Sequence, residues 1–347
     1  MTHPLRIVGA PGSPYSRKLR AVLRYRRIPH VWIMNFSKES RALPEPPVRL
    51  LPVLIYPDAQ GNPREAAIDS TPLIRRLERE FAGRSVVPPR PALAFLDALL
   101  EDYADEWLTK CMFHYRWAYP ADIEFASHVL PRWSAIDKSD AEIAPFSKQF
   151  AERQIGRLGV VGSNATTAPV IEASYRRLLA LLNARLSESP FVLGQRPGAC
   201  DFGLYGQLTQ LVGFDPTPLA IARAEAPRIC AWIDGVEDLS GLAAGDDEEG
   251  WLAAGEAPES LRALFTEVGR VYAPFLLANA RALAEKKPRV ECTIDGKPWV
   301  QDPFPYQGKC LRALREGYAA LAGGERAEVD AVLKGTGCEV LFAGGAR

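Results

Sequence analysis

A polar motif near the start of the chain carries the residues best suited to chemistry. It reads Gly12-Ser13-Pro14-Tyr15-Ser16 and lies between an apolar run, residues 5–8, and a segment of helical period, residues 13–27. A hydroxyl at a helix N-terminus lies beside unpaired backbone N–H groups and the positive end of the helix dipole, where an anion is stabilised. A bound thiolate would benefit most. The alternative is that Ser13 only caps the helix, as serines in such positions commonly do.

Two further features could bind a peptide-like ligand. Pro52 opens an apolar strand, and a cis bond before it would leave the N–H and C=O of Leu51 free to pair with a ligand main chain. Asp69 and Ser70 precede another helical segment, where a carboxylate and a hydroxyl could bind the ammonium and carboxylate of an amino acid. The alternative for this pair is plain N-capping.

The elements around these motifs alternate between strand and helix over residues 5–82. Short apolar runs at 5–8, 30–34, 53–56 and 65–68 predict strands, and segments 13–27 and 70–81 have the amphipathic period of helices. Residues 37–49 contain three prolines and cannot form one regular helix. The predicted order is therefore strand, helix, strand, irregular segment, strand, strand, helix.

The rest of the chain is predicted to be mostly helical. Residues 88–91 form a proline-rich linker, and residues 240–258 have the composition of a loop. Helices are predicted over 92–119, 140–159, 167–188, 201–211 and 226–236, then over 259–287, 306–321 and 326–333, with a hairpin at 290–300. These patterns divide the chain into an α/β domain (1–83), an all-α domain (92–239) and an α-rich extension (240–347).

Composition excludes several kinds of partner. The 347 residues include 42 basic and 42 acidic side chains, so a nucleic-acid partner is not indicated. No apolar run approaches the roughly 18 residues of a membrane span, and no signal-peptide core is present, so we expect a cytoplasmic protein with no membrane contact. The six cysteines are scattered without metal-binding spacing, and no metal is expected.

The three motifs, in this order over residues 5–82, resemble the N-terminal domain of the glutathione S-transferase family. The resemblance implies a thioredoxin-like βαβαββα domain that binds glutathione as cosubstrate. It implies that Ser13 faces the glutathione sulfur, that Leu51 and cis-Pro52 hold the cysteinyl backbone, and that Asp69 and Ser70 hold the γ-glutamyl end. Serine rather than cysteine at position 13 favours stabilising a free thiolate over forming a mixed disulfide.

A second resemblance extends the family pattern to about residue 238. Residues 191–205 are similar to the signature that caps a buried helix in the family's second domain. Asp201 matches the capping aspartate, whereas Gly198 stands where a hydroxyl residue is usual. Near the proline, only Arg49 could bind the glycyl carboxylate, and it is displaced by one position, so this contact stays unassigned.

The resemblance places a site for an apolar electrophile between the domains. The candidates for this site are Tyr15 and three residues near one face of the 92–119 segment: Tyr103, Trp107 and His114. The alternative is that these side chains are core or interface residues with no ligand. The predicted reaction is attack of the glutathione thiolate on a small hydrophobic substrate. The alternatives are a glutathione-dependent ether-cleaving enzyme and a non-catalytic scaffold. A homodimer is expected, with the extension packed on the helical domain and narrowing the electrophile site.

Overall fold

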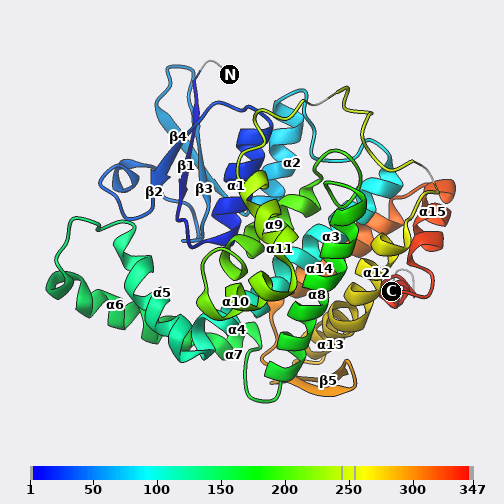
Figure 1. The fold of residues 1–347 in the computed structure, drawn as a ribbon. Coiled ribbons are helices and arrows are strands. Elements are labelled where there is room, and N and C mark those ends of the chain that lie inside the picture. The colour runs from blue at the N-terminus through cyan, green and yellow to red at the C-terminus, as the bar shows by residue number, and fades with distance from the viewer. Residues whose placement is uncertain (1–2, 244, 254, 344–347) are drawn as a thin grey trace.

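The computed structural model describes residues 3–243, 245–253 and 255–343. Its N-terminal part is a four-stranded sheet in the order β2-β1-β3-β4, in which β1 and β2 are parallel and the other neighbours are antiparallel (Figure 1). The elements are β1 (Leu5–Gly9), α1 (Pro14–Tyr25), β2 (His30–Met34), a 3₁₀ turn (Ser40–Ala42), β3 (Val53–Pro57), β4 (Pro63–Ile68) and α2 (Ser70–Glu80). The predicted thioredoxin-like plan is confirmed, and the segment between β2 and β3 is irregular apart from that turn.

The sheet separates two apolar layers because successive side chains of a strand point to opposite faces. Leu5 and Ile7 of β1 join the main core with the buried face of α1. Val8 points the other way and joins Val53 and Ile55 in a small cluster beneath the irregular segment. One face of the sheet is therefore covered by α1 and α2, and the other by a loop.

The second part of the chain is helical. The predicted helix over 92–119 is two helices, because the chain tightens at Trp107, whose carbonyl accepts a hydrogen bond from the N–H of Lys110, three residues on (2.9 Å). The patterns also missed two helices that begin with proline, α5 and α10. The elements are α3 (Pro91–Glu106), α4 (Leu108–Ala118), α5 (Pro120–Arg132), α6 (Asp140–Ile155), α7 (Leu158–Val161), α8 (Ala168–Glu188), α9 (Ala199–Leu211), α10 (Pro216–Glu225) and α11 (Pro227–Val236).

Helix α9 joins the two parts of the molecule. All of its residues are buried, and it packs against both α1 and α3 (Figure 1). Gly206 permits the close approach to α1, since an added Cβ there would lie 2.6 Å from the Pro14 carbonyl oxygen. The helix that begins at the Ser13 motif is thus fixed against the centre of the helical part.

The N-terminus of α9 shows how the unusual Gly198 is accommodated. Asp201 accepts hydrogen bonds from the N–H groups of Gly198 and Val192 (both 2.9 Å). The N–H of Cys200 donates to Asp97 of α3 (3.0 Å), so a carboxylate from another helix satisfies a donor that a capping hydroxyl would otherwise bind. An added Cβ at Gly198 would collide with the same Asp97 oxygen. The cap is therefore complete, and glycine is the residue that fits.

The extension packs on the helical part. Its elements are α12 (Glu259–Glu267), a π-helical turn (Val268–Tyr272), α13 (Ala273–Ala284), the hairpin β5 (Val290–Ile294) and β6 (Lys297–Gln301), α14 (Pro305–Ala319), α15 (Gly323–Leu333) and a 3₁₀ turn (Cys338–Leu341). Helix α12 packs against α8, and α14 and α15 pack against α3 (Figure 1). Most of its buried apolar residues share one hydrophobic core with the rest of the chain, and Ala278, Ala282 and Val290 form a small separate cluster. None of the described helices combines the length and apolarity needed to cross a membrane.

Candidate functional site

Ser13 is the residue immediately before α1. Its backbone is extended (φ −101°, ψ 114°), and its Oγ accepts a hydrogen bond from the N–H of Ser16 (3.3 Å). Ser13 thus caps the helix. Capping uses a lone pair of the hydroxyl oxygen, and within the described residues no acceptor binds the hydroxyl proton. The half-buried side chain can therefore cap the helix and still donate a hydrogen bond to a ligand.

The other hydroxyls of the motif are already engaged. The Tyr15 hydroxyl donates to the carbonyl oxygen of Asp105 on α3 (2.9 Å), and burial raises the pKa of this phenol well above its usual value. Ser16 is fully buried, and its Oγ accepts from the N–H of Ala10 (3.4 Å). The Tyr15 hydroxyl already has an acceptor and the Ser16 hydroxyl is enclosed, so the half-buried Ser13 is the donor of the motif that a ligand can reach.

Lys18, in the next turn of α1, also binds α1 to α3. Its ammonium is fully buried and pairs with Glu101 (2.7 Å) and Asp105 (2.5 Å). Removing the Lys18 ammonium would leave the Asp105 carboxylate in the interior without its cationic partner. Tyr15 and Lys18 therefore fix the position of α1 against α3, while Ser13 at the start of the helix is half-buried.

A buried arginine that the sequence analysis missed holds the loop before Ser13. Arg116 of α4 donates to the Gly12 carbonyl (3.0 Å), to Asp215 (2.8 Å) and to the side-chain oxygen of Gln210 (2.8 Å). Gln210 in turn donates to the carbonyl of Pro11 (3.0 Å). A lone arginine within the segment 113–119, which is rich in aromatic residues, was the available signal. This network fixes two carbonyls of the loop that carries Ser13.

An apolar surface borders the same loop. Leu130 and Trp133, at the end of α5, pack on the α-carbon of Gly12 so closely that an added Cβ would lie 2.5 Å from the Trp133 ring. The Trp133 ring also contacts Phe214 (centroids 5.2 Å apart). All three apolar side chains are half-buried. The sequence analysis did not select them, because their proximity to Ser13 depends on how α5 folds back.

Three of the predicted electrophile-site residues are core residues instead, which corrects that prediction. Tyr103 and Trp107 are at most 2% exposed and pack against aromatic rings of the extension. His114 is 4% exposed and contacts Ser163 (2.8 Å) and Glu172 (3.1 Å), and burial lowers its pKa. Tyr103 and Trp107 face the interior because the extension covers them, whereas His114 is enclosed by residues of the helical part.

The residues predicted to bind the glutathione peptide lie just before β3 (Leu51) and just after β4 (Asp69 and Ser70). The Leu51–Pro52 bond is cis, and in the described part of the chain the main chain of Leu51 has no hydrogen-bond partner. Asp69 has a left-handed backbone (φ 76°), and its side chain does not cap α2. Its Oδ2 instead accepts a hydrogen bond from Tyr306 of the extension (2.7 Å). Ser70 is buried in the first turn of α2.

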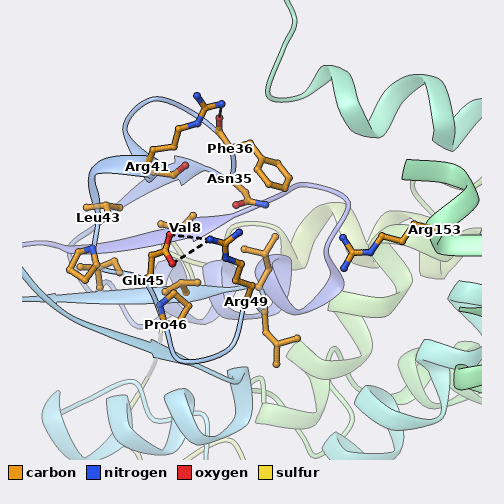
Figure 2. Close-up of a pocket in the computed structure, with 15 residues that line it drawn as sticks. Val8, Asn35, Phe36, Arg41, Leu43, Glu45, Pro46, Arg49 and Arg153 are labelled. Carbon is orange, nitrogen blue, oxygen red and sulfur yellow. Dashed lines mark hydrogen bonds and ion pairs between the residues drawn. The ribbon is translucent and has the colours of Figure 1, made fainter. Parts of the chain in front are cut away.

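A pocket of about 480 Å³ lies beside Leu51, beneath the irregular segment (Figure 2). Its lining includes Val8 and Ile55 of the sheet and three arginines: Arg41, Arg49 and Arg153. Arg49 pairs with Glu45 (3.2 Å). Arg153 comes from α6, and Figure 2 shows it on the far side of the pocket from Arg41. The pocket thus combines an apolar floor with an excess of positive charge.

No group of three or more His, Cys, Asp or Glu side chains suited to a metal occurs among the residues that the structure describes. The groups that the structure brings together at the start of α1 are the Ser13 hydroxyl, the helix N-terminus and an apolar surface.

Comparison with solved structures finds glutathione transferases at low identity. One from Rhodospirillum rubrum is 18% identical, with 76% of this chain and 92% of that chain covered and a TM-score of 0.42. One from Methylobacterium radiotolerans, in complex with glutathione sulfonate, is 16% identical (74% and 99% covered, TM-score 0.41). A family member from Pseudomonas fluorescens with two glutathione bound is 14% identical (75% and 92% covered, TM-score 0.41).

No curated protein matches the sequence. Residues 7–85, which contain Ser13, Leu51, Pro52, Asp69 and Ser70, match the family model described as Glutathione S-transferase, N-terminal domain. This part of the chain is therefore similar to the N-terminal domain of glutathione S-transferases.

Proposed function

We propose that the protein is a glutathione transferase that activates the glutathione thiol for attack on a hydrophobic electrophile. The observation that carries the proposal is the unused hydroxyl donor of Ser13, at the N-terminus of α1 in a glutathione S-transferase N-terminal domain. The donor and the helix N-terminus both stabilise a negative charge placed beside them. A thiolate is the charge that glutathione would bring.

The thiol pKa of bound glutathione needs to fall by only about two units. A thiol of pKa about 8.5 is only a few per cent ionised at pH 7, whereas a pKa about two units lower gives roughly three quarters thiolate. Such a shift corresponds to about 2.7 kcal/mol. One charge-assisted hydrogen bond, at about 1.5–3 kcal/mol, together with a helix N-terminus can supply it.

We propose that the rest of glutathione lies along the strand ends. The free main chain of Leu51 would pair with the cysteinyl unit, and Asp69 and Ser70 would bind the γ-glutamyl end. For the glycyl carboxylate we propose the arginine-rich pocket, with Arg49 and Arg153, which line it together with Leu51, as the candidate cations. This assignment follows from charge, because guanidinium groups bind carboxylates well.

We place the electrophile against Leu130, Trp133 and Phe214. Leu130 and Trp133 pack against the loop that carries Ser13, and Phe214 contacts Trp133. The side chains of Tyr103, Trp107 and His114 are instead enclosed in the core. An apolar substrate held there would be close to the thiolate, and proximity alone contributes substantially to the rate of a bimolecular reaction.

Calorimetric titration of the full-length protein with glutathione tests the proposal. We expect saturable binding at one site per chain, together with thioether formation on addition of an aryl halide or epoxide. Binding with cleavage of aryl ethers alone would favour the ether-cleaving alternative, and binding without turnover of either class would favour the scaffold. Absence of glutathione binding would contradict the proposal.

We further propose that the protein is a homodimer, as the resemblance to the family implies. Light scattering at micromolar concentration should give twice the chain mass of 38.2 kDa. A mass equal to that of one chain would contradict this prediction.

A further inference from the structure

The extension reaches the proposed glutathione site through one side chain. Tyr306 lies in the first turn of α14, and its hydroxyl donates to Oδ2 of Asp69 (2.7 Å), a residue 237 positions earlier in the sequence. Asp69 makes no capping bond to α2. The other oxygen of its carboxylate has no hydrogen-bond partner among the described residues, so a cationic ligand group can bind there.

Tyr306 is held in place from both sides. The buried Asn279 of α13 clamps the main chain of Phe304 with two hydrogen bonds, one to its carbonyl (2.9 Å) and one from its N–H (2.8 Å). The buried Gln307 donates to the main-chain and side-chain oxygens of Glu106 on α3 (3.1 and 3.0 Å). The backbone that carries Tyr306 is therefore fixed relative to α3.

Asp69 gains a defined orientation from this contact. Its left-handed backbone places it in a turn rather than in a helix, and an aspartate side chain there can adopt several rotamers. A hydrogen bond to one carboxylate oxygen selects a single arrangement and leaves the other oxygen for a ligand. Because that arrangement exists before binding, the ligand need not supply the ordering.

We propose that Tyr306 is a positioning residue that orients Asp69 toward the α-ammonium group of the γ-glutamyl end of glutathione. This inference rests on the proposed function. It assigns to the extension a role in ligand binding, and it predicts selectivity for ligands that carry a free ammonium group at that end. Tyr306 acts through Asp69 and takes no part in the chemical step.

The test compares Tyr306→Phe with the matched control Tyr318→Phe. Tyr318 belongs to the same helix, and its hydroxyl also donates to an aspartate, Asp330, at 2.7 Å, but both residues lie within the extension. We expect Tyr306→Phe to raise the dissociation constant and the KM for glutathione about 3- to 10-fold, the effect of one hydrogen bond, with kcat at saturating glutathione unchanged. Tyr318→Phe should leave all three values unchanged.

Two further comparisons test whether Tyr306 acts through Asp69. Binding of glutaryl-cysteinyl-glycine, which lacks the α-ammonium group, should be the same for wild type and Tyr306→Phe. In an Asp69→Asn background, Tyr306→Phe should cause no additional loss.

The outcomes separate this inference from the proposed function. If wild type binds glutathione and Tyr306→Phe binds it equally well, or if the variant weakens glutathione and the deamino analogue alike, the positioning role is wrong and the proposed function stands. If wild type does not bind glutathione, both are wrong.

Discussion

Replacing Ser13 with alanine is expected to lower turnover roughly 10- to 150-fold at neutral pH. The variant loses the hydroxyl that we propose donates to the glutathione sulfur, and one charge-assisted hydrogen bond is worth about 1.5–3 kcal/mol. Affinity for glutathione should change little, because Leu51, Asp69 and Ser70 hold the peptide. Since Ser13 also caps α1, the variant should lose about 1 kcal/mol of unfolding free energy.

The matched control is Ser139→Ala. Ser139 also caps a helix, α6: its Oγ accepts from the N–H of Glu142 (3.4 Å) and donates to the Glu142 carboxylate (2.7 Å), and its side chain lies outside the proposed site. It should lose similar stability, measured by urea denaturation, and retain wild-type turnover per folded molecule. Unchanged turnover in Ser13→Ala would reduce the role of Ser13 to capping. Ser13→Cys adds a second comparison, because a cysteine there should form a mixed disulfide with glutathione.

Replacing Arg116 with methionine should lower the free energy of unfolding by about 3–5 kcal/mol. Arg116 and Asp215 form a buried ion pair, and removing one partner leaves the other charge in the interior without compensation. Burial already raises the pKa of Asp215 to about 6, even though the arginine opposes this shift. Turnover should fall as well, because the loop carbonyl of Gly12 loses its donor.

A double variant separates the charge effect from the loss of packing. Arg116→Met combined with Asp215→Leu should be more stable than Arg116→Met alone, since no buried charge remains. Without the arginine the folded-state pKa of Asp215 lies further above its unfolded value. The loss in Arg116→Met should therefore shrink as the pH falls and Asp215 binds a proton. Equal stability of the single and double variants at pH 7, measured by urea denaturation, would contradict this account.

Local patterns were sufficient to predict the N-terminal domain. Strand His30–Met34 has the predicted bounds, and β1, β3, β4, α1 and α2 differ from the predictions by at most two residues at either end. Each of these elements is short, has a clear period and is bounded by Gly, Pro or Asp. Ser13, Leu51 and Asp69 could be selected because their positions relative to these local boundaries define their environment.

The environments of several candidate residues could not be predicted from the sequence, because they depend on long-range packing. Trp107 and Tyr103 have the spacing of a ligand-facing stripe, but Phe275, Trp299 and Tyr272 of the extension cover them. No local period shows which helix face will meet a segment some 170 residues later. The same limit applies to the approach of Trp133 to Gly12 and of Tyr306 to Asp69, which depend on the folding back of α5 and α14.

The central claim is that the N-terminus of α1 and Ser13 lower the pKa of the glutathione thiol. The most direct test is a pH titration of the ultraviolet thiolate absorbance of glutathione bound to the wild-type protein, with Ser13→Ala measured in parallel. We predict a pKa near 6.5 in the wild type, about two units below that of the free thiol, and a value at least one unit higher in Ser13→Ala. A thiol pKa near 8.5 in the wild-type complex would contradict the account.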